Sequence, residues 1–205
     1  MTIIVDYGLG NIGSIQNMIK KVGYDSKVSS NPSEILDASK IILPGVGAFD
    51  TGMSNLNSSG LTGVIKQKAE SGAVILGICL GMQLLADSSE EGCLPGLGLI
   101  KGHVKKFHFG DNANKLKIPH MGWNIVNPKK NIPLFADMPE EMRFYFVHSY
   151  HYVCDKDENV AGATMYGYEF ASAISSKNIY GMQFHPEKSH KFGMQLFRNF
   201  MELEC

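Results

Sequence analysis

The feature of this sequence that most constrains its fold is an alternation of short apolar runs with helical patterns through the first half of the chain. Apolar runs occur at 3–5, 40–43 and 73–78, and the last lacks any polar residue, which is typical of a strand covered on both faces. Between them, residues 15–22 and 61–70 carry apolar side chains at helical spacing. Strands alternating with helices predict an α/β fold with a doubly wound, mainly parallel sheet flanked by helices.

The second half of the chain has a different texture, with short β-like runs that predict an antiparallel extension of the sheet. These runs follow Gly92 and lie at 97–107, 118–126, 142–153 and 170–184. The fold class expected is therefore a mixed, mainly parallel sheet with antiparallel strands in the C-terminal half.

Local signals place further elements. Asn31 followed by Pro32 is typical of a helix start, because the Asn side chain caps the helix and Pro suits its first position. An amphipathic helix is expected at 190–203, and an exposed loop at 108–117. Nothing in the sequence divides the chain, so we expect one domain over residues 1–205.

Composition excludes several classes of partner. The chain has 205 residues, with 19 basic and 20 acidic side chains, and no basic block of the kind that nucleic acid or an anionic membrane requires. The N-terminus does not resemble a signal peptide. Cys79, Cys93, Cys154 and Cys205 lack CxxC spacing, which favours reduced thiols in the cytoplasm over disulfides or a zinc site.

A glycine pattern near the N-terminus permits a rival interpretation. Gly8, Gly10 and Gly13 form G-x-G-x-x-G between a strand and a helix, as in dinucleotide-binding oxidoreductases. Such enzymes also need a carboxylate roughly 20 residues further on, at the end of the second strand. The sequence there reads Ser29, Ser30, Asn31, so the pattern is better explained as a tight turn that uses glycine for its backbone freedom.

Cys79 lies between Gly77 and Gly81, where an apolar strand turns into a helix. This is the position of the nucleophile in the G-x-S-x-G elbow of other α/β enzymes. The glycines would let strand and helix approach closely, and the helix N-terminus favours thiolate over thiol. A buried structural cysteine is the alternative that the local pattern leaves open.

A base and a group to orient it occur near the end of the chain. His185 and Glu187 are two residues apart after the apolar run 179–184, so on an extended segment they face the same side. Glu187 can then steady the imidazole while its other nitrogen addresses the thiol of Cys79. We therefore predict a Cys–His–Glu catalytic triad.

The other histidines do not suggest a metal centre. His148 and His151 are three apart, which does not match a shared strand face, and no carboxylate or cysteine completes a ligand set. His103, His108 and His120 are interpreted as loop or surface residues. No metal and no cofactor are expected.

Taken together, the motifs resemble a known family. The set is similar to the class I, triad-type glutamine amidotransferases, and within them to the glutaminase subunits of imidazole glycerol phosphate synthase. The resemblance extends from Asp6 to Ser189. It rests on the stretches DYGLGN, LPGVGAF, GICLGMQLL, SEEG, PHMGWN, VHSY and HPEKS.

The resemblance implies a mechanism in which Cys79 attacks the side-chain amide of glutamine and forms a γ-glutamyl thioester. His185 would take the thiol proton, protonate the departing ammonia and later activate water, and Glu187 would orient it. It also implies that the oxyanion is held by the backbone of Leu80 and of the PGVG segment around Val46 and Gly47. The implied substrate-binding positions are Gly47, Gln83, Glu91, Ser149 and Tyr150.

The resemblance also implies a heterodimer that channels ammonia to a (β/α)8 barrel synthase, which makes imidazole glycerol phosphate in histidine biosynthesis. The implied contact positions are Asn11, Trp123, Tyr145 and Lys188. A core position for Trp123 is the alternative. Two other functions stay open: the same glutaminase chemistry serving a paralogous synthase that amidates surface-polysaccharide sugars, or a non-catalytic relative in which Cys79 senses redox state.

Overall fold

A computed structural model describes residues 1–110 and 116–204 of the chain. Its strands are β1 (Thr2–Val5), β2 (Lys27–Ser29), β3 (Lys40–Leu43), β4 (Val74–Ile78), β5 (Ser88–Ser89), β6 (Gly102–Lys106), β7 (His120–Pro128), β8 (Met142–His148), β9 (Tyr150–Cys154), β10 (Val160–Tyr166), β11 (Tyr168–Ser176) and β12 (Ile179–Met182). Its α-helices are α1 (Ile12–Lys21), α2 (Pro32–Leu36), α3 (Phe49–Ser58), α4 (Leu61–Glu70), α5 (Leu80–Gln83) and α6 (His190–Glu202). Short 3-10 turns occupy Pro133–Phe135, Asp157–Asn159 and Pro186–Lys188.

The strands form a mixed sheet whose two halves differ in direction. Strands β2, β1, β3, β4 and β12 are neighbours in that order, and each pair among them is parallel. The sheet continues through β11, β10, β7 and β8 with antiparallel pairing. Strands β5, β6 and β9 lie off this path. Strand β5 pairs with β6, β6 pairs with β9, and β9 pairs with β11. The expected mixed α/β fold is confirmed.

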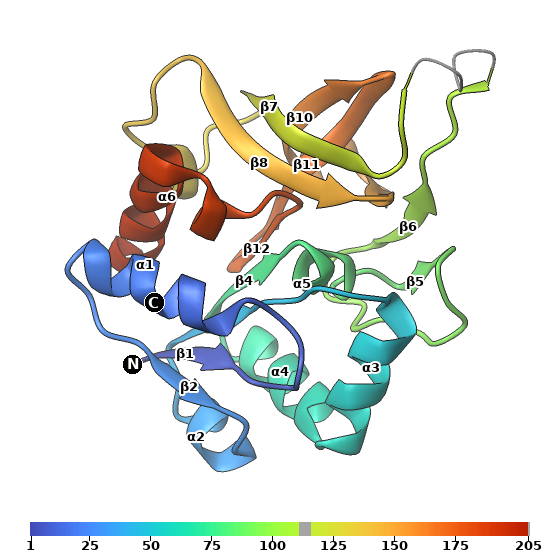
Figure 1. Cartoon of the computed structure of the whole chain (residues 1–205). Coiled ribbons are helices and arrows are strands. Elements are labelled where there is room, and N and C mark those ends of the chain that lie inside the picture. The colour runs from blue at the N-terminus through green and yellow to red at the C-terminus, as the bar shows by residue number, and fades with distance from the viewer. Residues whose placement is uncertain (111–115, 205) are drawn as a thin grey trace.

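The parallel strands are buried on both faces, which explains their continuous apolar sequences. Ile3, Ile41 and Ile75 point into one core, whereas Ile4 and Ile42 point into the other, because successive side chains of a strand alternate between faces. Helices α2, α3 and α4 cover the first face, and α1 and α6 cover the second (Figure 1). Each helix thus buries its apolar stripe against the sheet.

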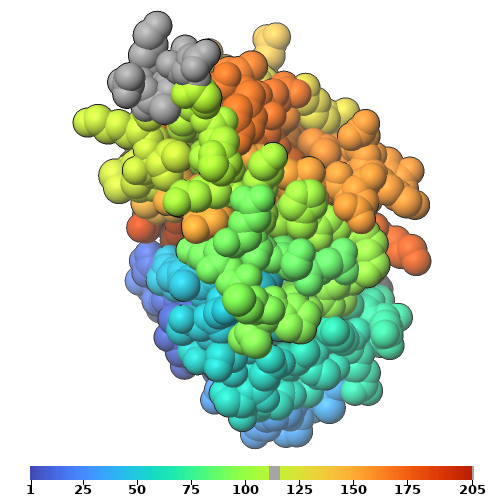
Figure 2. All heavy atoms as spheres, turned by 90° about the vertical axis from the view of Figure 1, so that its right-hand side faces the viewer, coloured from blue at the N-terminus to red at the C-terminus, as the bar shows by residue number. Residues whose placement is uncertain are grey.

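The antiparallel strands lie beyond the carboxyl ends of the parallel ones (Figure 1). In Figure 2 the segment that precedes these strands is green. It lies between the first half of the chain, in blue and cyan, and the second half, in yellow and orange. This segment is held to the residues just after α5 by backbone bonds, among them Leu97 N–H to the Leu84 carbonyl at 2.8 Å and Leu99 N–H to the Leu85 carbonyl at 2.9 Å. The junction of the two halves is therefore packed around α5.

Most of the expected elements occur where the sequence predicted them. The strand at Lys40–Leu43 and the helix at Leu61–Glu70 have the expected bounds, and the Asn31 side chain accepts a hydrogen bond from Ser33 N–H at 3.0 Å as a helix cap. The middle of the loop expected at 108–117, residues 111–115, lies outside the described residues. The single domain over residues 1–205 stays a prediction.

Helix α3 was not predicted, although the sequence carries a signal for it. Its buried residues Phe49, Gly52, Met53 and Leu56 recur at the spacing of one helix face. Three glycines and several short polar side chains in and around it obscured that pattern. Among the described residues, no helix combines the length and the apolar character needed to cross a membrane.

Gly81→Ala tests the closeness of α5 to the sheet. A Cβ at Gly81 would collide with the carbonyl oxygen of Leu43, so we expect the substitution to lower the free energy of unfolding by about 1–3 kcal/mol. Gly63→Ala is the matched control, because Gly63 is exposed inside α4 with open space around it and the substitution should raise stability by about 0.5–1 kcal/mol. Denaturant titration measures both, and equal stability of the two variants would contradict the packing described here.

Candidate active site

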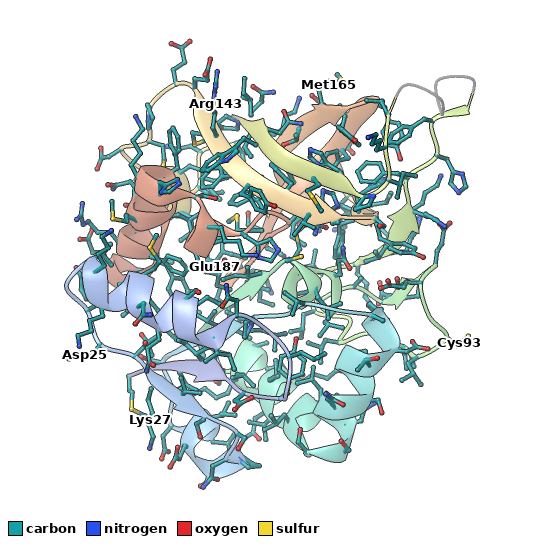
Figure 3. All side chains as sticks on the ribbon, viewed as in Figure 1. Asp25, Lys27, Cys93, Arg143, Met165 and Glu187 are labelled. Carbon is teal, nitrogen blue, oxygen red and sulfur yellow. The ribbon has the colours of Figure 1, made fainter. Side chains whose placement is uncertain are left out.

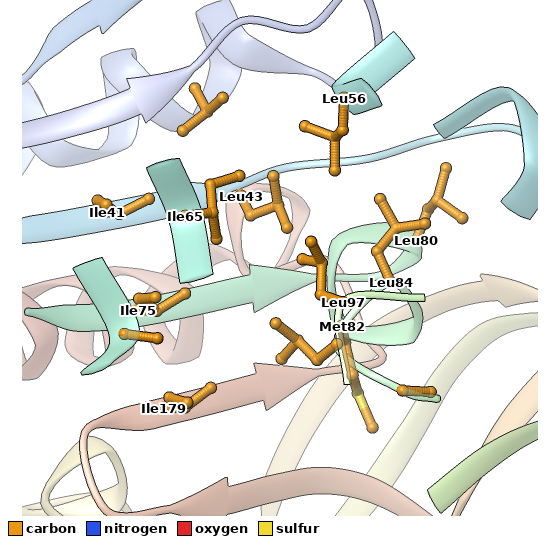
Figure 4. Packing of buried hydrophobic residues seen from close by; sticks show 14 of the residues in the cluster. Ile41, Leu43, Leu56, Ile65, Ile75, Leu80, Met82, Leu84, Leu97 and Ile179 are labelled. Carbon is orange, nitrogen blue, oxygen red and sulfur yellow. The ribbon is translucent and has the colours of Figure 1, made fainter. Parts of the chain in front are cut away.

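Cys79 occupies a strained turn between β4 and α5. Its backbone has φ 53° and ψ −110°, a conformation that non-glycine residues rarely adopt and that costs of order 1–3 kcal/mol. The flanking glycines are required sterically: a Cβ at Gly77 would lie 2.6 Å from the Gly81 carbonyl oxygen. Figure 4 shows Leu80 and Leu84 from this turn packed among the core residues at the end of β4. Local packing therefore fixes the thiol in place.

His185 and Glu187 form a buried pair. The imidazole Nδ1–H of His185 donates to Glu187 Oε1 at 2.8 Å, and each side chain is 1 % exposed. Among the described residues, Nε2 of His185 has no hydrogen-bond partner. Glu187 lies near the centre of the molecule (Figure 3). Nδ1 is thus occupied by the carboxylate, and Nε2 is the nitrogen left to exchange a proton with a reacting group.

The electrostatics of the pair favour the charged imidazole. Burial alone would lower the pKa of His185, but the Cys79 sulfur and the Glu187 carboxylate outweigh it and raise the pKa to about 10. Below that pH the ring therefore keeps both of its protons, the one on Nδ1 that faces Glu187 and the one on Nε2.

One cavity of about 320 Å³ collects the residues that the sequence singled out. It lies at the carboxyl end of β4, where open α/β sheets place their ligand sites. Glu187 does not line it and instead lies behind His185. The predicted site residues that line the cavity are Val46, Gly47, Cys79, Leu80, Gln83, Glu91, Ser149, Tyr150 and His185.

The PGVG segment forms one wall of this cavity and is held from both ends. Tyr7 Oη donates to the Pro44 carbonyl at 2.5 Å, and burial raises the pKa of this phenol, which keeps it a donor. At the other end, the Glu91 carboxylate accepts from Phe49 N–H at 2.9 Å. Gly47 between them has φ 113°, which only glycine adopts readily. The segment is anchored around a flexible glycine.

The first loop of the chain packs against the PGVG segment at Gly10. A Cβ at Gly10 would lie 2.8 Å from Pro44 Cβ, so glycine there permits the loop to pack on the PGVG segment. Gly8 and Gly10 both have positive φ. Backbone conformation and packing thus account for Gly8 and Gly10, whereas Gly13 has open space around it.

Gln183 is a residue of the site that the sequence reasoning missed. It is fully buried, its Nε2 lies 3.8 Å from Cys79 Sγ, and its Oε1 accepts from Gln83 Nε2 at 3.0 Å. The same Gln83 amide donates to the Tyr150 carbonyl at 3.1 Å. The available signal was its spacing of two residues before His185 at the end of β12.

Three of the four residues expected at a partner interface form a cluster on β7, β8 and the turn before α6, in which Trp123 and Lys188 are exposed and Tyr145 is half-buried. Trp123 is 48 % exposed, which excludes the core position considered for it, and its ring stacks on His190 at a centroid distance of 5.5 Å. It packs edge-on against Tyr145, its cross-strand neighbour, and Lys188 Nζ lies 5.7 Å from the Tyr145 ring centroid. Asn11 immediately precedes α1, the helix that contacts the turn Pro186–Lys188.

The interpretation of His120 as a loop or surface residue was wrong. His120 is the first residue of β7, is 3 % exposed, and faces inward because alternate residues of this strand, such as Met121, face solvent. Burial lowers the pKa of His120 to about 4, of His148 to about 3 and of His151 to about 4. His103 and His108 are exposed, as expected.

Comparison with known proteins agrees with this geometry. The family model for glutamine amidotransferase class-I matches residues 3–203. The chain belongs to the class I glutamine amidotransferase family. The resemblance inferred from the motifs is therefore confirmed.

Full-length relatives of this amidotransferase have one name in common. The chain is 52% identical to imidazole glycerol phosphate synthase subunit HisH 2 of Methanococcus maripaludis, over 98% of the chain and 99% of the relative. It is 47% identical to the protein of that name from Pseudomonas aeruginosa, over 99% and 100%. It is 46% identical to subunit HisH of Bdellovibrio bacteriovorus, again over 99% and 100%.

Solved structures support the amidotransferase fold. The crystal structure of a glutamine amidotransferase matches with a TM-score of 0.73 and 17% identity, over 98% of this chain and 97% of that one. The structure of PurLQS from Thermotoga maritima matches with a TM-score of 0.72 and 22% identity, over 98% and 96%.

Glu187→Gln tests the electrostatic role of the carboxylate in this amidotransferase. We expect the pKa of His185 to fall from about 10, because the variant loses the negative charge while burial continues to disfavour the imidazolium. Side-chain NMR titration of the 15N-histidine-labelled chain measures this. The wild-type ring should keep its proton as the pH rises past 6.5, and the variant should release it at lower pH. Glu70→Gln on the exposed end of α4 is the control, and an unchanged titration in Glu187→Gln would contradict the assignment.

Proposed function

We propose that this chain is the glutaminase subunit of an imidazole glycerol phosphate synthase, and that it supplies ammonia for histidine biosynthesis. The observation that carries the chemistry is that Cys79 and His185 line one cavity while Glu187 holds the far nitrogen of the imidazole. The full-length relatives named as HisH subunits support the pathway.

In the first half of the reaction Cys79 Sγ attacks the side-chain amide carbon of glutamine. Because the ring is an imidazolium at neutral pH, the proton that the thiol gives up is held on His185 Nε2, the nitrogen that has no other partner among the described residues. The imidazolium then protonates the amide nitrogen, which leaves as ammonia when the C–N bond breaks. A γ-glutamyl thioester remains on Cys79.

In the second half water attacks the thioester carbon. His185 removes a proton from this water, the C–S bond breaks, and glutamate and the free thiol result. Glu187 stays ionised throughout and keeps the ring in one orientation through its 2.8 Å bond to Nδ1. Its contribution is orientation and stabilisation of the positive ring.

Each tetrahedral intermediate carries a negative oxygen that needs preorganised donors. Leu80 is the first residue of α5, so its N–H has no acceptor within the helix and is available as one donor. We assign the second donor to the peptide between Val46 and Gly47, because both residues line the cavity and Gly47 permits its rotation.

The cavity also offers groups for the rest of the substrate. The Glu91 carboxylate suits the α-amino group of glutamine, and the backbone of Ser149 and Tyr150 suits its polar atoms. Gln83 contributes by fixing the Tyr150 carbonyl. In this assignment the amino-acid end is bound chiefly by the loop after β5 and the turn after β8.

Ammonia is mostly protonated in neutral water and is then not nucleophilic, so it must reach its acceptor by a sheltered route. We assign the acceptor site to a (β/α)8 barrel synthase subunit that docks on the cluster of Trp123, Tyr145 and Lys188. An exposed tryptophan packed on a half-buried tyrosine, beside a long cationic side chain, is typical of interfaces. We propose the cytoplasm as the location, in agreement with free Cys79, Cys93 and Cys154.

Cys79→Ala tests the nucleophile. In the complex with the barrel synthase subunit, we expect glutamine-dependent synthesis to fall by a factor of about 10⁴ or more, because no other group can form the thioester. Synthesis from added ammonium salt should stay at the wild-type rate, since the synthase site is unchanged. Loss of both activities, or survival of the glutamine-dependent one, would contradict the assigned role.

Trp123→Ala tests the docking surface. Removal of an aromatic anchor from an interface typically costs about 2 kcal/mol or more, so the dissociation constant for the synthase subunit should rise by about 30-fold. Calorimetric titration of one subunit into the other measures it. Leu36→Ala is the control, because Leu36 is 36 % exposed on α2, far from this cluster, and should leave the affinity unchanged. Equal affinities of the two variants would exclude this surface.

A further inference from the structure

A chain of buried hydrogen bonds connects β7 to the turn beside the active cavity. His148 Nδ1 lies 2.7 Å from the Tyr150 carbonyl oxygen, and His148 Nε2 lies 2.9 Å from Nδ1 of His120, its cross-strand partner. His120 Nε2 lies 3.2 Å from Asn124 Nδ2. None of these contacts belongs to the catalytic triad.

The direction of every bond in this chain follows from its ends. The Tyr150 carbonyl can only accept, so the proton of His148 is on Nδ1 and its Nε2 is an acceptor when the ring is neutral. The facing Nδ1 of His120 must then donate, which leaves His120 Nε2 to accept from the amide of Asn124. The Asn124 amide is oriented independently, because its Nδ2 also donates to the Met165 carbonyl at 3.0 Å and its Oδ1 accepts from Ile125 N–H.

The surroundings keep both rings neutral. His120 stacks between Phe146 and Tyr166 at centroid distances of 4.7 Å and 4.0 Å, and His148 lies 5.2 Å from the Phe107 centroid. The desolvation that follows lowers the pKa of both histidines. The titratable groups whose charges act on His148 are His120, His151 and His185, and none of them is a carboxylate that could favour the charged form.

The chain of hydrogen bonds reaches the active cavity at the Tyr150 carbonyl. This carbonyl accepts from His148 on one side and from Gln83 Nε2 at 3.1 Å on the other. Gln83 is in turn bonded to Gln183, whose amide lies 3.8 Å from Cys79 Sγ. The turn itself is short, because Ser149 alone separates β8 from β9. A carbonyl held from two sides fixes the conformation of this turn.

We infer that His148 and His120 are positioning residues that hold the glutamine-binding turn at Ser149 and Tyr150 through a one-directional relay of Nδ1–H imidazoles. The inference rests on the proposed function for the identity of the substrate. The relay consists only of groups of this protein, so it can be tested without substrate.

The first test is the tautomeric state of the two rings in the full chain. Long-range 1H–15N correlation NMR of the 15N-histidine-labelled protein distinguishes Nδ1–H, Nε2–H and doubly protonated imidazoles, and the loss of one signal in each single variant assigns them. Both rings should be neutral Nδ1–H tautomers at pH 7. An Nε2–H tautomer or an imidazolium at either position would overturn the relay, whatever the protein's substrate is.

The second test is a matched pair of variants in the complex with the barrel synthase subunit. In His148→Asn the amide nitrogen takes the place of Nδ1 and can still donate to the Tyr150 carbonyl. In His148→Gln the amide reaches the place of Nε2 instead, so this donor is lost. We expect His148→Gln to raise KM for glutamine by about tenfold with a change in kcat below about threefold, and His148→Asn to raise KM by less than about threefold.

His151→Gln is the control, because His151 is buried in the same aromatic cluster but bonds Tyr168 Oη at 2.8 Å and not the turn. It should leave KM within about twofold of the wild type. Equal KM values for the two His148 variants, or a defect confined to kcat, would overturn the positioning role. Absence of any glutaminase activity in the wild-type complex would instead refute the proposed function, and the NMR result would still decide whether the relay exists.

Discussion

The close approach of Gly81 to the Leu43 carbonyl is the contact on which the rest of the site depends. It brings the start of α5 against the carboxyl end of β3, so that the PGVG segment leaving β3 and the nucleophile leaving β4 lie side by side. Gly45 belongs to the same contact, since a Cβ there would lie 2.8 Å from Gly81 N. Two backbones meet here without side chains between them, and the strained Cys79 backbone is held by this packing.

The order of the strands in the sheet is the second feature on which the assembly of the site depends. Strand β12 lies next to β4 although about a hundred residues separate them, and Cys79 N–H bonds to the Met182 carbonyl at 2.7 Å. The residues that follow β12 are therefore delivered to the thiol, Gln183 first and His185 two positions later. The antiparallel strands extend from β12 through β11, so the second half of the fold is attached to the strand that leads to His185.

Sequence patterns predicted what depends on neighbouring residues and missed what depends on tertiary contacts. Strand periodicity, glycine turns and the Asn31 cap gave the parallel half, and the chemistry of cysteine, histidine and glutamate singled out three residues that the structure brings together. The burial of His120 could not be predicted, because the sequence does not show which side chains will cover a histidine from neighbouring strands. The bond from Gln183 toward Cys79 joins residues 104 positions apart, which no local pattern encodes.

The proposed docking surface and the triad share one piece of backbone. The Tyr145 carbonyl accepts from His185 N–H at 2.8 Å, and Tyr145 N–H donates to Ser189 Oγ at 3.0 Å, whose hydroxyl in turn donates to the His185 carbonyl at 2.6 Å. The side chain of Tyr145, on the other hand, packs against exposed Trp123. A partner that shifts β7 and β8 would therefore move the backbone of His185 directly. Because packed strands shift as units, such a movement would also reach His148 at the end of β8.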